Sequence, residues 1–217
     1  MRSLIIGASG GIGAALLQAC AAQGEALGLS RSKDGLEITD EASVVKVLSH
    51  LSGDFDRILI ATGALAPKGA RPEKSLRALE PGQLLQQVAT NALGPALLLK
   101  HLLPLIPRAR PCQIGVLSAR VGSIGDNALG GWYSYRAAKA ALNQLVHTAA
   151  IEVARSHPQA VLACLHPGTV ETRFTEGYSA KKTTPEQAAA QLLKVLAALT
   201  PAQSGGFYDW AGKQLPW

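Results

Sequence analysis

The stretch YSYRAAK contains Tyr133, Tyr135 and Lys139. A helix turns about 100° per residue, so Tyr135 and Lys139 share one face, whereas Tyr133 lies on roughly the opposite side from Lys139. An ammonium close to a phenol favours the phenolate and lowers a pKa that is ordinarily about 10. The pair therefore predicts an acid/base for a carbonyl/alcohol interconversion, with a nicotinamide carrying the hydride. An exposed tyrosine beside a long lysine has the same spacing, so spacing alone leaves both open.

A cluster of glycines follows the first apolar run, in IIGASGGIGAAL. Gly7, Gly11 and Gly13 would let the backbone approach a pyrophosphate, whose charge a helix N-terminus favours. The spacing G-x-x-x-G-x-G differs from the general dinucleotide fingerprint. A merely tight turn is the alternative, but the position after a first strand favours dinucleotide binding.

The end of the second apolar run, LGLSRSK, carries basic rather than acidic residues. An acidic residue here prefers the free 2′-hydroxyl of the adenosine ribose, and an arginine accommodates a 2′-phosphate. Ser30, Arg31 and Lys33 follow Leu29, and a guanidinium matches phosphate in bidentate fashion. The sequence therefore predicts NADP(H) over NAD(H), with a solvated Arg31 as the alternative.

Short apolar segments alternate with longer helical patterns along the chain. Continuously apolar strands separated by helices indicate a parallel sheet covered on both faces, and right-handed crossovers make it a doubly wound α/β, Rossmann-type fold. Ligands bind such folds at the carboxyl ends of the strands. We expect a single domain over residues 1–217, and a bend near Gly94 and Pro95 in the long helical segment. The predicted strands are 3–7, 25–30, 57–63, 113–119, 160–168 and 205–210, and the predicted helices are 12–24, 40–51, 81–106, 133–156 and 184–199.

Composition narrows the class of protein. The 217 residues carry a net charge of +6, but the basic residues are scattered. A basic chain can bind nucleic acid or an acidic membrane, and it can equally bind a small phosphorylated ligand, which the motifs favour. The longest apolar stretch is interrupted by Pro95, Lys100 and Pro104, so we expect no membrane span and no signal peptide.

Three cysteines lie far apart in the sequence and form neither a zinc spacing nor a disulfide framework. We therefore expect buried thiols, a reducing cytoplasmic location and no metal site. His166 would be a hydrogen-bonded residue at a strand end rather than a catalytic base.

Five motifs occur in order at the expected strand ends: the Gly7–Gly13 cluster, ATG at 61–63, Asn91, YRAAK at 135–139 and HPGTVET at 166–172. With them the chain resembles the short-chain dehydrogenase/reductase family over nearly its whole length. RVGSIGDNALGGWYSYRAAKAALN and the ending GGFYDWAGKQLPW are similar to the C-factor-like subgroup, close to sniffer-type carbonyl reductases.

The resemblance implies roles for individual residues. Tyr135 would be the catalytic acid/base, and Lys139 would also bind the nicotinamide ribose. Asn91 would sit at a helix irregularity and hold a water that links Lys139 to a proton relay. The other cofactor-binding residues would be Gly7, Ser9, Gly11, Ile12, Gly13, Ser30, Arg31, Glu37, Ile38, Ala61, Thr62, Gly63, Pro167, Gly168, Val170 and Thr172.

One departure from the family pattern concerns the catalytic serine, which normally stands three residues before a glycine. Counting back from Gly122 gives Ala119. Ser118 would turn in if the strand ended early, or Ser123 would donate the hydrogen bond to substrate, or the site lacks that donor. Losing it would weaken catalysis rather than abolish it. Trp132 could touch substrate.

The leading hypothesis is an NADP(H)-dependent enzyme that interconverts a small-molecule carbonyl and alcohol. The alternative is an NADP(H)-binding signalling or regulatory protein with little turnover, motivated by Ala119 and the C-factor-like resemblance. The resemblance also implies a homodimer or homotetramer assembled through 81–106 and 133–156. The loop 173–183 is expected to cover the pocket.

Overall fold

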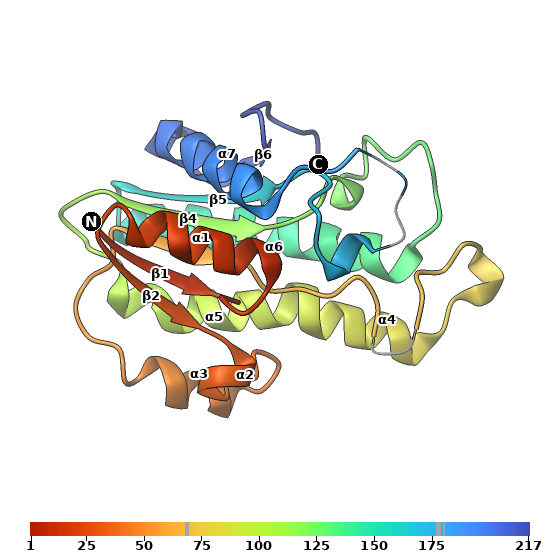
Figure 1. Cartoon of the computed structure of the whole chain (residues 1–217), viewed down its shortest axis with the longest axis horizontal. Helices are drawn as coiled ribbons and strands as arrows, with labels where there is room; N and C mark the ends of the chain where they lie inside the picture. The colour runs from red at the N-terminus through yellow and green to blue at the C-terminus, as the bar shows by residue number, and fades with distance from the viewer. Residues whose placement is uncertain (68–69, 177–178, 180) are drawn as a thin grey trace.

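The computed structural model describes residues 1–67, 70–176, 179 and 181–217. They contain a six-stranded parallel sheet in the order β2-β1-β3-β4-β5-β6, with helices on both faces (Figure 1). The predicted doubly wound α/β fold is confirmed, and each predicted strand is present. The first strand has the predicted length but begins one residue earlier, and the other five are shorter than expected. The strands are β1 (Arg2–Ile6), β2 (Glu25–Leu29), β3 (Arg57–Ile60), β4 (Cys112–Leu117), β5 (Ala160–His166) and β6 (Phe207–Asp209).

Alternation along the strands divides the core into two layers. Leu4 and Ile6 of β1 pack on one side of the sheet, and Ile5 packs on the other. Burying one such side chain contributes about 1.5–3 kcal/mol. Helices α1 (Gly11–Ala21) and α7 (Pro185–Ala198) cover the Ile5 side. The opposite side is covered by α3 (Glu41–Leu48), α5 (Gly94–Leu102) and α6 (Tyr133–Ser156), with α4 (Pro81–Val88) beside α6.

The segment predicted as one helix over 81–106 is interrupted. A π-helix, η2 (Ala89–Leu93), separates α4 from α5, and a 3₁₀ turn, η3 (Leu103–Leu105), follows α5. Pro95 has no backbone N–H, so it cannot donate to the carbonyl of Asn91 as a regular helix would require. The irregularity therefore lies directly before the Gly94-Pro95 position where we expected a bend.

A short helix, α2 (Arg31–Asp34), follows β2 and was not predicted. Four residues are too few to show a 3.6-residue hydrophobic period, and none of the four is buried. The Oγ atom of Ser30 accepts from the backbone N–H of Lys33 at its start, and Gly35 ends it with a φ of 67°.

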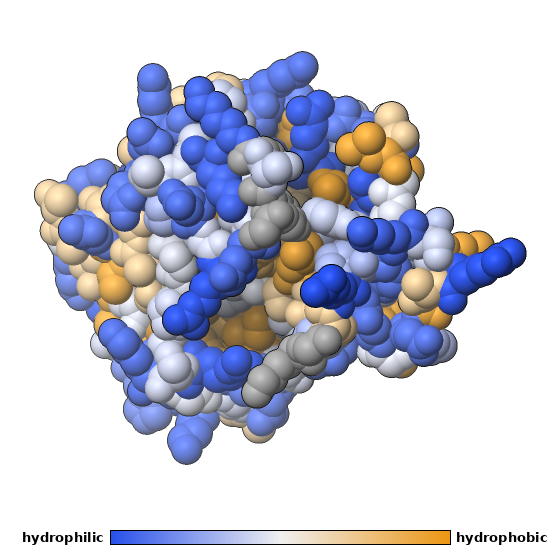
Figure 2. Space-filling model, turned by 45° about the vertical axis from the view of Figure 1, so that its right-hand side comes forward, coloured by the Kyte–Doolittle hydropathy of each residue, from blue (hydrophilic) through white to orange (hydrophobic). Residues whose placement is uncertain are grey.

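The carboxyl ends of the parallel strands meet at one edge of the sheet, the edge that Figure 2 brings forward. Hydrophilic groups predominate on this face, and hydrophobic groups lie both in hollows between them and in smaller patches at the surface. No helix within the described residues is long and apolar enough to cross a bilayer.

Candidate active site

Tyr135 and Lys139 lie together on the buried face of α6. Tyr135 is 4% exposed and Lys139 is 3% exposed, whereas Tyr133 is 38% exposed, as the helical spacing predicts. The Nζ atom of Lys139 lies 6.0 Å from the centroid of the Tyr135 ring. It donates a hydrogen bond to the carbonyl oxygen of Leu117 at 3.0 Å, which ties α6 to the end of β4.

Burial changes the acidity of this lysine. Desolvation lowers the pKa of Lys139 to about 8, and the charge interaction with Cys164 of β5 acts in the opposite direction. Burial also raises the pKa of the Cys164 thiol to about 12, so that thiol is neutral near pH 7. Lys139 is therefore an ammonium at neutral pH that loses its charge just above it.

Asn91 and Gly63 meet Lys139 from two other elements. The side chain of Asn91, fully buried in η2, accepts from the backbone N–H of Ala64 at 3.0 Å and donates to the Ala64 carbonyl at 2.9 Å. A Cβ placed on Gly63 would lie 2.8 Å from Asn91 Oδ1 and 3.6 Å from Lys139 Nζ. The segment after β3, the π-helix and α6 therefore converge on one point at the carboxyl edge of the sheet.

The glycine-rich turn between β1 and α1 lies at the same edge. Gly7 has a φ of +92°, and a Cβ on it would lie 2.6 Å from the carbonyl oxygen of Ala61, so a side chain here would be strained and crowded. A Cβ on Gly11 would lie 2.6 Å from Thr172 Cγ2, which brings the start of α1 against the segment after β5. Ser9 is exposed and Ile12 is half-buried.

These features fit a dinucleotide. The first turn of α1 has no side-chain cap, which leaves its N–H groups available to a phosphate. The Oγ1 atom of Thr62, just after β3, is buried without a hydrogen-bond partner among the described residues. A glycine cradle, an uncapped helix start and a buried free hydroxyl at one strand edge are features that a polar, phosphorylated ligand would satisfy.

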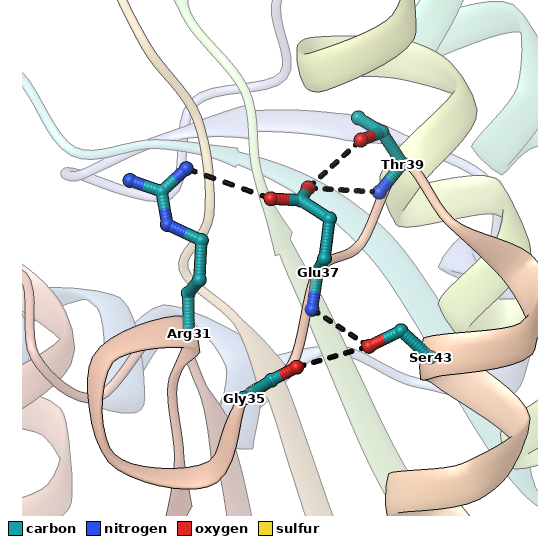
Figure 3. A network of polar contacts seen from close by, with 5 residues as sticks. All are labelled: Arg31, Gly35, Glu37, Thr39 and Ser43. Carbon is teal, nitrogen blue, oxygen red and sulfur yellow. Dashed lines mark hydrogen bonds and ion pairs between the residues drawn. The ribbon is translucent and has the colours of Figure 1, made fainter.

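The end of β2 carries a polar network that includes the predicted 2′-phosphate residue (Figure 3). The guanidinium of Arg31, 80% exposed, lies 3.6 Å from Glu37 Oε2. The other oxygen of Glu37 accepts from Thr39 Oγ1 at 2.8 Å, and hydrogen bonding to Thr39, followed by the charge of Arg31, lowers the pKa of Glu37. Ile38 packs against Gly94, on which a Cβ would lie 2.8 Å from its side chain.

The two candidate serines both make internal hydrogen bonds. Strand β4 ends at Leu117, and the hydroxyl of Ser118 donates to Asn143 Oδ1 at 2.6 Å on the α6 side. The hydroxyl of Ser123 accepts from the backbone N–H of Asp126 at 3.1 Å. The hydroxyl proton of Ser118 is therefore used within the fold, whereas the Ser123 hydroxyl acts as an acceptor in its contact, and the three alternatives for the serine role stay predictions.

Aromatic rings surround Tyr135. The ring of Trp132 lies 6.3 Å away and that of Phe174 lies 5.8 Å away, centroid to centroid. Phe174 belongs to the segment 173–183, for which we predicted a covering loop but no individual contact. Positions 177, 178 and 180 of that prediction lie outside the described residues.

Sequence reasoning also missed Glu73, a buried residue beside α6.

The segment after β5 holds the remaining predicted positions. Val170 is buried and pairs with Thr183 in an isolated bridge, and Thr172 borders a hollow of about 380 Å³. Pro167 is followed by Gly168, on which a Cβ would lie 3.1 Å from the ring of Trp210.

The prediction for His166 was wrong in one respect. Its Nδ1 atom is buried without a hydrogen-bond partner among the described residues, and burial lowers the pKa of the ring to about 4.

Comparison with known proteins agrees with this geometry. A family model described as enoyl-(acyl carrier protein) reductase matches residues 7–205. The chain is 32% identical over 185 residues to 1-hydroxy-2-glutathionyl-2-methyl-3-butene dehydrogenase of a Rhodococcus species. The aligned region covers 84% of this chain and 79% of that protein. It is 34% identical over 128 residues to C-signal of Myxococcus xanthus, with coverage of 58% and 74%.

Among solved structures, an NADPH-bound carbonyl reductase from chicken fatty liver is similar, with a TM-score of 0.85 and 25% identity, covering 100% of this chain and 98% of that one. The carbonyl reductase Sniffer of D. melanogaster has the same fold, with a TM-score of 0.84 and 22% identity over 100% and 99% of the two chains. Because the family model spans most of the chain and the Rhodococcus relative is similar over most of its length, the chain belongs to the short-chain dehydrogenase/reductase family of oxidoreductases.

Proposed function

We propose that this protein interconverts a carbonyl and an alcohol with NADP(H), using Tyr135 as the acid/base. The observation that carries the proposal is the burial of Tyr135 and Lys139 on one face of α6, at the point where Gly63 and Asn91 also lie. The similarity to an NADPH-bound carbonyl reductase supports the class of reaction and the cofactor.

Each residue has a defined task in this proposal. Bound NADPH would supply a hydride to the carbonyl carbon of the substrate. Tyr135 donates its phenolic proton to the carbonyl oxygen, and the Lys139 ammonium stabilises the phenolate that results. Asn91 fixes the segment after β3 through its two hydrogen bonds to Ala64, which keeps Gly63 close to Lys139.

Arg31 supports the preference for NADP(H). Its guanidinium is exposed at the end of β2, where a 2′-phosphate would lie in this fold. Glu37 is held by Thr39 and lies 3.6 Å from Arg31, so it orients the guanidinium at the surface. A doubly charged phosphate would compete favourably with one exposed carboxylate for this partner.

The experiment is a turnover assay with NADPH and a panel of ketones and aldehydes, following the absorbance of the reduced cofactor. We expect Tyr135→Phe to lower kcat by roughly 10³-fold or more, because an essential proton donor is lost. Tyr133→Phe is the matched control, since it removes a partly exposed phenol two residues away on the same helix. Activity that survives Tyr135→Phe unchanged would contradict the mechanism.

A second candidate function is NADP(H) binding for signalling or regulation with little turnover. It is favoured by Ala119, by the hydrogen bond that the Ser118 hydroxyl donates to Asn143, and by the similarity to C-signal. It predicts NADPH binding without reduction of any carbonyl in the same panel. Assembly through 81–106 and 133–156 into a dimer or tetramer, and a cytoplasmic location, remain predictions under either function.

A further inference from the structure

Glu73 is a buried carboxylate that the sequence motifs did not single out. It belongs to the segment of the chain that connects β3 to α4, and it is 4% exposed. It takes part in no ion pair within the described part of the chain. A buried charge is costly unless hydrogen bonds satisfy it, so its partners indicate what it does.

The partners of Glu73 are at the start of α6. The hydroxyl and the backbone N–H of Ser134 both donate to its carboxylate, the latter at 3.3 Å. The backbone N–H of Trp132 donates to the backbone carbonyl of Glu73 at 2.5 Å. The first N–H groups of a helix have no partner within the helix, and the helix dipole favours an anion there. Glu73 therefore caps α6 from a position 61 residues away in the sequence.

The residue before the helix cannot provide this cap itself. Trp132 is the N-cap residue of α6, and an indole N–H is a donor that cannot accept from a helix N–H. The turn that leads into it is unusual, since Gly130, Gly131 and Trp132 have φ values of 65°, 65° and 54°. The guanidinium of Arg136, one turn into α6, donates to the carbonyls of Gly130 and Gly131 at 3.0–3.3 Å. Two side chains of opposite charge thus hold the start of α6.

Tyr135 directly follows the capped residue. It lies in the first turn of α6, and its ring contacts Trp132, which Glu73 also holds. A misplacement of about 1 Å in a reacting group can cost 10²-fold in rate. We propose that Glu73 is a positioning residue that fixes the first turn of α6 and so holds the Tyr135 phenol in place for proton transfer. This inference rests on the proposed function, because it concerns the proton donor of that reaction.

The test compares Glu73→Gln, which keeps the size of the side chain, with Ser134→Ala, which removes only the hydroxyl donor. Glu152→Gln is the matched control, because it neutralises an exposed carboxylate on the same helix. We measure amide hydrogen exchange of residues 133–136, kcat and KM for a reducible carbonyl, and the Kd for NADPH. Kinetics are recorded well below the midpoint of thermal unfolding of each variant.

In Glu73→Gln we expect exchange at residues 133–136 to rise at least tenfold and kcat to fall about 10- to 100-fold, with the Kd for NADPH changed less than about twofold. Combining it with Ser134→Ala should add little, because both remove the same contact. Unchanged exchange, or an unchanged kcat despite faster exchange, would overturn the inference. So would a parallel loss of kcat, NADPH affinity and global stability, which would make Glu73 a general folding residue.

Failure of the proposed function looks different. If the wild-type protein binds NADPH but turns over no carbonyl, the positioning role falls with that function, whereas faster exchange in Glu73→Gln would still establish the cap. If the wild type is active and exchange at 133–136 does not respond, only the inference about Glu73 is lost.

Discussion

At the scale of single residues, the central feature is a lysine whose acidity is set by its surroundings. The pKa difference between the ordinary 10.5 and about 8 corresponds to roughly 3 kcal/mol, which opposes the burial of a charged Lys139. A position selected for stability alone would hold an apolar side chain here. Under the proposed function, the ammonium is retained close to a buried phenol because it takes part in the reaction.

The pH dependence of carbonyl reduction tests this role. We expect kcat to fall as pH rises through about 8, because Lys139 loses the charge that stabilises the developing phenolate. Initial rates are measured from about pH 6 to pH 9 with saturating NADPH. A rate that stays constant across pH 8 would contradict a role for the Lys139 charge.

A loss of stability caused by the titration of Lys139 cannot explain a fall in kcat as pH rises through 8. Its folded pKa lies below its unfolded value, so the unfolded chain binds more protons between about pH 8 and 10.5. The contribution of Lys139 to stability is therefore smallest below pH 8 and rises across that window. Buried Cys112 and Cys164, whose pKa values are raised to about 12, act in the opposite direction above pH 9. Assays below pH 9 therefore report the effect of the Lys139 charge on kcat without the loss of stability that the two cysteines cause above pH 9.

At the scale of elements, the π-helix η2 connects the strand edge to the active helix. Its placement follows from Pro95, which removes one donor from the regular helical pattern. The π turn presents Asn91 to the backbone of Ala64 on one side and to the region of Lys139 on the other. A regular helix would rotate this side chain to a different direction.

Asn91→Ala tests the importance of that link. We expect the free energy of unfolding to fall by about 1–3 kcal/mol, because the N–H and C=O of Ala64 lose buried partners. Activity should fall further than stability requires, since Gly63 would no longer be fixed beside Lys139. Denaturant unfolding and kcat are measured in parallel, with Gln86→Ala, at an exposed position in α4, as the control. If Asn91→Ala and Gln86→Ala had the same free energy of unfolding and the same kcat, Asn91 in the π turn would have no role in positioning Gly63 beside Lys139.

At the scale of the whole molecule, cofactor binding and folding are coupled. The residues expected to hold the dinucleotide come from segments after β1, β2, β3 and β5, so binding would join parts of the chain that are far apart in sequence. A ligand that binds only the folded state raises the unfolding temperature by mass action. Thermal unfolding therefore reports on the complete site rather than on one side chain.

Arg31→Ala separates the two cofactors in such an experiment. We expect it to weaken NADPH binding roughly 10- to 100-fold, as the loss of a charge-assisted phosphate contact implies, and to leave NADH binding nearly unchanged. The shift in unfolding temperature is compared with NADPH, with NADH and without ligand. Arg155→Ala, at an exposed position near the end of α6, is the control. If NADPH stabilises the wild type and Arg31→Ala equally, the exposed arginine has no part in cofactor choice.

Local patterns were sufficient for the order of the strands and helices and for the pairing of Tyr135 with Lys139. Apolar runs mark buried strands whatever their neighbours are, and an i, i+4 pair shares a helix face in any fold. The boundaries of α6 agree with the prediction, whereas α2 was missed because four exposed residues have no period to detect.

Residue patterns alone were enough to predict a doubly wound sheet, a glycine-rich turn after its first strand, and a tyrosine and lysine on one side of a helix. The environment of those groups depends on the folded chain. It includes the burial that shifts the pKa of Lys139, the hydrogen bonds of Ser118 and Ser123, the π turn that contains Asn91 and the cap from Glu73. The physical reason is that periodicity is local, whereas desolvation and capping depend on segments that meet only after folding.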